Sequence, residues 1–116
     1  MTHCTFCDII AGHSPAKIIY RDERAIAFYD RSPRTPVHAL VVPLEHIASL
    51  NDLMPEHEGL AGHLLLVAQQ VARQENIAAS GYQLVINTGR GAGQIVYHLH
   101  VHVGFRSKSD VKTQPN

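Results

Sequence analysis

The sequence predicts an α+β domain in which helices pack on an antiparallel sheet of about five strands. Runs of β-branched and aromatic residues, separated by short turns, indicate strands that pair as hairpins. One segment has the apolar spacing of a long helix, and one or two shorter segments are expected to form short helices. The order of two strands, a third strand, the long helix and two more strands favours antiparallel pairing.

The first half of the chain predicts a short helix followed by three strands. Residues 5–12 (TFCDIIAG) indicate a short helix or turn. Residues 17–22 (KIIYRD) and 25–30 (AIAFYD) indicate a hairpin around a charged turn. The proline-punctuated residues 30–38 (DRSPRTPVH) predict an extended loop, which leads into a buried strand at residues 38–43 (HALVVP).

The second half predicts the long helix and two further strands. Residues 46–53 (HIASLNDL) indicate a short helix, and the long helix follows from Pro55, with apolar residues at 60, 64, 67, 68 and 71. Strands are expected at residues 82–87 (YQLVIN) and 97–104 (YHLHVHVG), joined by a glycine-rich loop. The polar residues 107–116 are expected to form a C-terminal tail.

The bulk properties exclude several classes of function. With 116 residues, 45% of them hydrophobic, the chain is expected to form a single domain over residues 1–116. Its ten basic and ten acidic residues do not give the positive surface of a protein that coats nucleic acid or an anionic membrane. No apolar run is long enough for a membrane span, and the N-terminus does not resemble a secretory signal. We therefore expect a cytoplasmic protein that binds neither nucleic acid nor membranes.

The most informative segment is YHLHVHVG, in which His98, His100 and His102 alternate with apolar residues. On a strand the three imidazoles share one face, about 6 to 7 Å between successive members. A solvated polar face explains one such histidine, whereas three at alternate positions suggest a shared task. Two tasks suit neutral imidazole. It can bind a metal ion, or it can attack phosphorus or a carbonyl carbon as a nucleophile.

The glycine-rich loop TGRGAGQ, residues 88–94, helps to choose between these tasks. Its glycines allow backbone N–H groups to surround phosphate oxygens, although a hairpin loop needs glycine equally for its positive φ angles. Next to a strand that carries a nucleophile, the loop favours phosphoryl or nucleotidyl transfer over chemistry at a metal ion. The two cysteines, Cys4 and Cys7, have the C-x-x-C spacing of a metal or redox pair.

These residues resemble the histidine triad family. HLHVHVG matches the family motif His-φ-His-φ-His-φ-φ, where φ is apolar, and the chain is similar to the branch of histidine triad nucleotide-binding proteins. The resemblance implies the HIT-like fold, and it covers a core at residues 4–106. Further segments that occur in the family's order and spacing are FCDIIAG, PAKIIY, AIAFYD, PVHALVVPLEHI, GYQLVINTG and GQIVYHLHVHV.

The resemblance implies a nucleotide hydrolase or nucleotidyl transferase of the purine nucleoside 5′-monophosphoramidase kind. His100, the middle histidine, is implied as the nucleophile that attacks the α-phosphorus and forms a nucleotidyl-histidine intermediate. His102 is implied to bond the phosphate or the bridging atom, and His38 to lie next to the nucleophile as a supporting catalytic histidine. Imidazole suits two displacements at phosphorus because it is both a nucleophile and a good leaving group.

The resemblance also implies a binding site for a purine nucleotide of the AMP type. Asp30 matches the position that binds the ribose hydroxyls. Three apolar residues match positions around the base: Phe6, Ile9 and Phe28. Residues that match the phosphate pocket are Asn87, Gly93 and Gln94, together with His100 and His102.

A structural zinc ion is implied by the resemblance to members with an N-terminal C-x-x-C. The matching positions are Cys4, Cys7, His46 and His98, and a Cys2His2 set satisfies tetrahedral Zn²⁺ in a closed, structural site. The alternative is that Cys4 and Cys7 are reduced thiols. A thioredoxin-like redox pair is less favoured, because no βαβ pattern follows the cysteines.

Two positions depart from the family pattern. Ile95 stands where many phosphoramidase members have a serine that can donate a hydrogen bond to the phosphate or leaving group. Arg31 stands where many have an apolar residue near the base and ribose. The family commonly forms homodimers through the long helix and a neighbouring strand, so we expect a homodimer.

Three other functions stay open at this point. The same nucleophile would suit hydrolysis of a dinucleoside polyphosphate such as diadenosine tetraphosphate. A non-catalytic nucleotide-sensing or partner-binding module is the second alternative, and a metalloenzyme that uses the histidine row as a catalytic metal site is the third.

Overall fold

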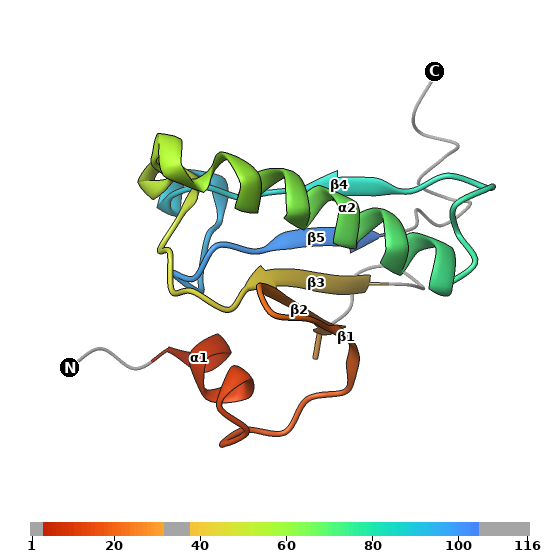
Figure 1. Ribbon diagram of the computed structural model, residues 1–116, viewed down its shortest axis with the longest axis horizontal. Helices are drawn as coiled ribbons and strands as arrows, with labels where there is room; N and C mark the ends of the chain where they lie inside the picture. The colour runs from red at the N-terminus through yellow and green to blue at the C-terminus, as the bar shows by residue number, and fades with distance from the viewer. Residues whose placement is uncertain (1–3, 32–37, 105–116) are drawn as a thin grey trace.

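The computed structural model describes residues 4–31 and 38–104, in which an antiparallel five-stranded sheet carries one long helix. The strands lie in the order β1-β2-β3-β5-β4, and each neighbouring pair is antiparallel (Figure 1). They are β1 (Ile18–Arg21), β2 (Ala25–Tyr29), β3 (His38–Pro43), β4 (Gln83–Val85) and β5 (Val101–Gly104). The helices are α1 (Thr5–Ile10) and α2 (Glu58–Gln74), with single 3-10 turns η1 (Leu50–Asp52), η2 (Pro55–His57) and η3 (Arg90–Ala92). The predicted α+β class is confirmed.

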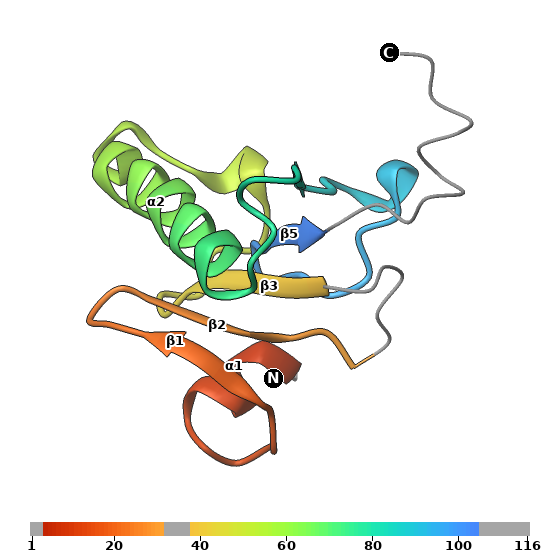
Figure 2. The same cartoon turned by 90° about the vertical axis from the view of Figure 1, so that its right-hand side faces the viewer.

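Strands β2 and β3 are buried on both faces, because a helix covers each side of the sheet. One set of alternate residues packs beneath α2, and the other set packs against Phe6 and Ile9 of α1. Figure 2 shows the two helices on opposite sides of the sheet. The residues under α2 are mostly small, namely Ala25, Ala27, Ala39 and Val41. Those facing α1 are Ile26, Phe28, Leu40 and Val42.

The segment that carries the histidines keeps the predicted alternation of sides. Leu99, Val101 and Val103 lie in the core beneath α2. The rings of His98 and His100 contact Phe6 on the opposite side of the sheet. Helix α1 therefore covers the side on which the histidines lie.

The hydrogen-bonded extent of this segment was predicted wrongly. β5 begins at Val101, so residues 97–100 precede the ladder. Before Val101 the segment does not pair with β3. The Leu99 N–H donates instead to the Ile47 carbonyl, at 2.6 Å. His98 and His100 consequently sit on a bent approach to the strand, where their environments differ.

Other element boundaries also differ from the sequence prediction. The strand expected at residues 82–87 covers only β4, and the helix expected at residues 46–53 shrinks to the turn η1. The predicted loop between β2 and β3 and the predicted tail at 107–116 fall largely or wholly outside the described residues. Within residues 4–31 and 38–104, no helix is both long and apolar enough to cross a membrane.

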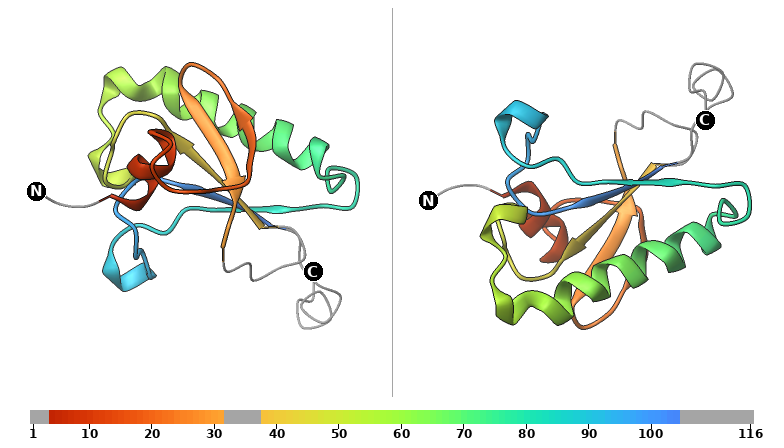
Figure 3. Two further views of the ribbon diagram at one scale, coloured as in Figure 1. Left: turned by 90° about the horizontal axis from the view of Figure 1, so that it is seen from below. Right: turned by 90° about the horizontal axis from the view of Figure 1, so that it is seen from above.

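Both views in Figure 3 place η3 at the same end of the molecule as α1. The glycine-rich loop that contains η3 leads directly into the histidine segment. The fold thus brings together, at one end of the molecule (Figure 3), the glycine-rich loop, the two cysteines at the start of α1, and His98.

Candidate active site and metal centre

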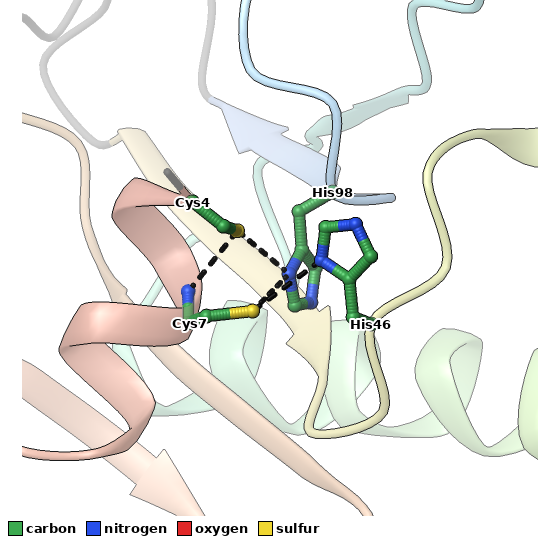
Figure 4. A group of neighbouring side chains, drawn as sticks. All are labelled: Cys4, Cys7, His46 and His98. Atoms are coloured by element: carbon green, nitrogen blue, oxygen red, sulfur yellow. Dashed lines mark hydrogen bonds between the residues drawn. The ribbon is translucent and has the colours of Figure 1, made fainter. Parts of the chain in front are cut away.

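The histidine segment contributes to two neighbouring groups of polar side chains. His98 belongs to the first group, with Cys4, Cys7 and His46 (Figure 4). His102 belongs to the second, with Asp30 and His38. His100 lies between them in the chain, and its ring centroid is 4.9 Å from that of His102.

The first group has the dimensions of a tetrahedral zinc site. Bond lengths of about 2.3 Å for Zn–S and about 2.0–2.1 Å for Zn–N place sulfur and nitrogen ligands about 3.5 Å apart. The sulfur-to-nitrogen distances are 3.4 Å for Cys4 Sγ to His98 Nδ1, 3.3 Å for Cys7 Sγ to His46 Nδ1, and 3.6 Å for Cys7 Sγ to His98 Nδ1. Two thiols and two imidazoles also form a closed ligand set. The cluster can therefore hold a metal ion.

Local structure explains how α1 presents both cysteines. Cys4 is the N-cap residue of α1, and its Sγ accepts a hydrogen bond from the Cys7 N–H at 3.3 Å. The C-x-x-C spacing equals the separation between an N-cap side chain and the backbone donor that it caps. Burial, followed by the neighbouring Cys4, raises the pKa of the Cys7 thiol to about 11. A bound cation would have to displace the thiol proton.

The orientation of His98 is fixed by a backbone carbonyl. Its ring is fully buried, and Nε2–H donates to the Pro43 carbonyl at 2.8 Å. Because a carbonyl only accepts, the lone pair of the neutral ring is on Nδ1, which faces the cysteines. Burial lowers the pKa of His98, which favours this neutral form. A second partner that fixes the tautomer is the usual arrangement for a metal-binding histidine.

His100 uses its two nitrogens in the opposite way. Its Nδ1–H donates to the His98 carbonyl at 2.7 Å, so the lone pair of the neutral ring is on Nε2. Burial lowers the pKa of His100, while its backbone hydrogen bond opposes this shift. The edge-to-face contact with Phe6, at 5.1 Å between centroids, packs the ring from one side. The lowered pKa favours the neutral ring, and the hydrogen bond from Nδ1 leaves its lone pair on Nε2.

His102 is joined to a chain of polar groups. Its Nδ1 lies 2.9 Å from His38 Nε2, and the same His38 nitrogen lies 3.5 Å from Asp30 Oδ2. His38 is the first residue of β3, and β3 pairs with β5, the strand that contains His102. The structure thus places His38, expected next to the nucleophile, in contact with His102.

A pocket of about 610 Å³ opens beside His100 and His102. One part of its wall is apolar and includes Phe6, Ile9 and Phe28, of which the two aromatic rings meet edge to face at 5.4 Å. The polar part contains Asp30, Asn87, Gly93, His100 and His102. All of these residues were expected to bind a nucleotide, and the fold brings them into one cavity.

Gln94 occupies a different place from the expected one. It is buried, and it is not among the residues that line the pocket. Its Oε1 accepts from the Gly89 N–H at 2.9 Å, and its Nε2 donates to the carbonyls of Ala48 and Val96. The side chain turns inward because these buried backbone groups need partners. Gln94 thereby fixes both ends of the glycine-rich loop.

The loop itself needs glycine at the two ends of η3. Gly89 and Gly93 have φ angles of 83° and 85°, which disfavour residues with a side chain. Asn87 supports the loop from inside the pocket, since its Nδ2 donates to the Ala92 carbonyl at 3.0 Å. The hairpin role and the phosphate-binding role proposed for these glycines are therefore compatible.

Several pocket residues were missed by sequence reasoning. Lys17 and Tyr29 line the pocket, and the Lys17 ammonium lies 5.7 Å from the centre of the Tyr29 ring. The remaining unassigned lining residues are Thr5, Pro15, Ala16, Leu40 and Val96. Lys17 lies in PAKIIY and Tyr29 in AIAFYD, two segments that match the family but to which no binding role was assigned for these residues. Arg31 and Ile95, the two departures from the family pattern, also line the pocket.

Comparisons with known proteins agree with this geometry. Residues 3–114 match the family model described as "Scavenger mRNA decapping enzyme C-term binding". A purine nucleoside phosphoramidase of Escherichia coli is 44% identical over 98 residues, which cover 84% of this chain and 82% of the relative. An uncharacterized HIT-like protein of Synechococcus elongatus is 48% identical, covering 84% and 85%. The chain belongs to the histidine triad family.

Solved structures of the histidine triad family show the same fold. A HIT family hydrolase from Clostridium thermocellum superposes with a TM-score of 0.91 at 37% identity, covering 100% of this chain and 97% of that one. A HIT family hydrolase from Legionella pneumophila gives a TM-score of 0.88 at 37% identity, with coverages of 91% and 95%. The predicted HIT-like fold is confirmed. At the level of the family, the chain is a hydrolase.

Proposed function

We propose that the chain hydrolyses purine nucleoside 5′-phosphoramidates through a covalent nucleotidyl-His100 intermediate. The observation that carries this proposal is the 2.7 Å hydrogen bond from His100 Nδ1 to the His98 carbonyl, which makes Nε2 the lone-pair nitrogen of a neutral ring. His100 also lines a pocket large enough for a small ligand. The 44% identical relative from Escherichia coli is named a purine nucleoside phosphoramidase, which supports the substrate class.

The proposed reaction consists of two displacements at the α-phosphorus. In the first, His100 Nε2 forms a bond to phosphorus while the phosphorus–nitrogen bond of the substrate breaks, and the leaving nitrogen takes one proton from solvent to become the free amine. In the second, a water oxygen forms a bond to phosphorus, the phosphorus–Nε2 bond breaks, and the water proton is released. The products are a nucleoside monophosphate, an amine and the original neutral imidazole.

The two parts of the pocket wall suit the two ends of a nucleotide. We assign the apolar wall of Phe6, Ile9 and Phe28 to the base, and the Asp30 carboxylate to the ribose hydroxyls. The phosphate would then lie between His102 and the loop residues Asn87 and Gly93. Donors placed around the phosphate stabilise charge on its oxygens, which is usually the largest single contribution to such catalysis.

The test is intact-protein mass spectrometry after mixing with adenosine 5′-phosphoramidate and quenching without acid. Wild type should carry a transient adduct of one adenylyl group, and His100→Ala should form neither adduct nor product while still binding AMP. His63→Ala is a matched control, because His63 lies outside this pocket. Turnover by His100→Ala at the wild-type rate would disprove the covalent mechanism.

The isoleucine at position 95 supports two alternative functions, a dinucleoside polyphosphate hydrolase and a nucleotide-sensing module, and the same test includes both. Its side chain is 85% exposed at the pocket and cannot donate a hydrogen bond to a leaving group. Faster turnover of diadenosine tetraphosphate than of the phosphoramidate would identify a dinucleoside polyphosphate hydrolase. AMP binding without turnover of either compound would identify a nucleotide-sensing module.

We further propose that Cys4, Cys7, His46 and His98 hold a structural Zn²⁺ ion. The ligand distances and the fixed tautomer of His98 support zinc, and four protein ligands leave no position for substrate. Such an ion would tie α1 to the segment that carries His100. Purified protein should contain one zinc per chain by atomic emission, and Cys4→Ser should lose it.

We also propose that the chain is a cytoplasmic homodimer. β4 is an edge strand whose residues are all exposed, and α2 exposes Leu65 and Leu66, by 52% and 63%. Apolar side chains on an edge strand and a neighbouring helix are expected to be covered by a partner. Sedimentation equilibrium should give the mass of two chains for wild type and of one chain for Leu66→Glu.

A further inference from the structure

The second group of donors, Asp30, His38 and His102, has the composition of a transition-metal site. Each residue offers one imidazole nitrogen or carboxylate oxygen, and the three atoms lie within 4.8 Å of one another. Two histidines and one carboxylate bind divalent iron, cobalt, nickel or zinc well. The group shares no residue with the Cys2His2 cluster.

The distances within this group suit ligands of a single ion. Two nitrogen ligands about 2.0–2.1 Å from one ion are about 2.9 Å apart at a right angle and about 3.4 Å apart at the tetrahedral angle. His38 Nε2 is 2.9 Å from His102 Nδ1 and 3.5 Å from Asp30 Oδ2. Small shifts of the side chains would therefore bring all three atoms into one coordination sphere.

The surroundings leave room for exchangeable ligands. Asp30 and His102 both line the 610 Å³ pocket, whereas His38 is buried behind them with 6% exposure. An ion held from the His38 side would thus face the pocket, where water could complete its coordination.

We propose that Asp30, His38 and His102 bind one divalent transition-metal ion, and that this ion and the nucleotide exclude each other. The exclusion rests on the proposed function, in which Asp30 binds the ribose and His102 binds the phosphate. Metal binding itself does not depend on it. The hydrogen bond between the two histidines requires a proton on one nitrogen, so the ion must displace that proton to another ring nitrogen or to water.

The affinity of this site should be lower than that of the Cys2His2 cluster. Lys17 and Arg31 line the same pocket and repel a cation. The site also lacks thiolate ligands. We therefore expect it to fill only after the cysteine cluster, and to reduce turnover when it fills.

Cobalt(II) distinguishes the two sites by its spectrum. Cobalt bound by cysteine sulfur shows intense ligand-to-metal charge-transfer absorption, which a site of two nitrogens and one oxygen lacks. Protein that already carries one equivalent of zinc should bind one further equivalent of cobalt, with weak visible bands and without sulfur charge transfer. The absence of a second equivalent would overturn the proposal.

Two variants locate this second equivalent. His38→Gln should weaken cobalt binding at least about tenfold, as expected for the loss of a ligand. His63→Gln should change it less than twofold, because His63 forms an imidazole–carboxylate pair with Asp22, at 2.6 Å, outside the pocket. If circular dichroism shows that His38→Gln is unfolded, Asp30→Asn takes its place, since its side chain is partly exposed. Equal binding by the folded variant and wild type would refute the assignment.

Adding AMP tests the exclusion separately. Saturating AMP should release the second cobalt equivalent while the cysteine cluster keeps its zinc. If AMP binds by calorimetry and the cobalt stays, the exclusion is wrong and the proposed nucleotide site stands. If cobalt binds but AMP does not bind under any condition, the nucleotide proposal fails and the metal site stands.

Discussion

His98 and His100 are two residues apart in one segment, yet they use opposite ring nitrogens. His98 donates from Nε2 to the Pro43 carbonyl and turns Nδ1 toward Cys4 and Cys7. His100 donates from Nδ1 to the His98 carbonyl, so the lone pair is on Nε2. In each case a backbone carbonyl selects the tautomer, and the tautomer selects the chemistry. The same side chain can thereby offer Nδ1 to a metal ion at one position and, in the proposed mechanism, Nε2 to phosphorus at the other.

The largest expected difference is in turnover. His100→Ala should lower turnover of adenosine 5′-phosphoramidate by roughly 10⁴-fold or more, as loss of a nucleophile usually does. His98→Ala should keep most of its turnover at low temperature, because the carbonyl that orients His100 is main chain and survives the substitution. Steady-state rates of both variants below their melting temperatures provide the measurement. Equal losses in the two variants would break the comparison.

The next difference is in thermal stability. Cys7→Ser should lower Tm by about 10 °C or more, because loss of a bound structural ion removes folding free energy. His100→Ala, which leaves the Cys2His2 set intact, should shift Tm much less. Differential scanning calorimetry of zinc-loaded protein, with and without a chelator, gives both values. A wild-type Tm that does not respond to the chelator would argue against a structural ion.

A third histidine sharpens the comparison because its partner is a carboxylate. His63 Nε2 lies 2.6 Å from Asp22 Oδ2, which also accepts from the Tyr20 hydroxyl. Burial acts to raise the pKa of Asp22, but these bonds and two backbone N–H donors outweigh it and hold the pKa well below its usual range. The folded pKa lies below the unfolded one, so the stabilisation is present above about pH 4 and is lost as the pH falls further.

Asp22→Asn should therefore melt several degrees below wild type at pH 7, and this gap should shrink as the pH falls toward 3. Glu23→Gln is the control, since Glu23 is the exposed next residue. Thermal melts at a series of pH values measure the gap. A gap that does not change with pH would mean that the carboxylate charge contributes nothing.

The smallest expected effect concerns the leaving group. Ile95→Ser should raise turnover of the phosphoramidate a few-fold, because a hydroxyl at the pocket can donate to the leaving group. Tm should stay unchanged, since Ile95 is 85% exposed. Stopped assays with the same substrate measure the rate, and a lower rate in the serine variant would show that the isoleucine contacts the substrate favourably.

Much of the fold was visible in the sequence. The alternation from Leu99 to Val103 predicted which side chains enter the core, because a period of two is inherent to extended chain. The extent of the strand was not predictable, since Leu99 bonds to Ile47 rather than to β3. Propensity cannot anticipate such a competition between partners that are distant in sequence.

The candidate site, too, was predictable only in part, because some of its contacts join residues that are distant in sequence. The resemblance supplied eight of the residues that line the pocket, whereas Gln94, also expected there, is not among the lining residues. That side chain has three backbone partners, from residues 48, 89 and 96, and only the folded loops bring them together. Lys17 and Tyr29 were missed because nothing in the local sequence indicates that a residue beside or within a strand borders a cavity.

The sequence by itself determined the residue types, their alternation and the C-x-x-C spacing that caps α1, all of which depend on neighbours within a few residues. Tertiary structure decided which nitrogen of His98 is protonated, because its acceptor is the Pro43 carbonyl, 55 positions away in the chain. The acceptor for His100 is only two residues away, at His98. A hydrogen bond fixes a tautomer only when its acceptor is in place, and folding alone puts it there.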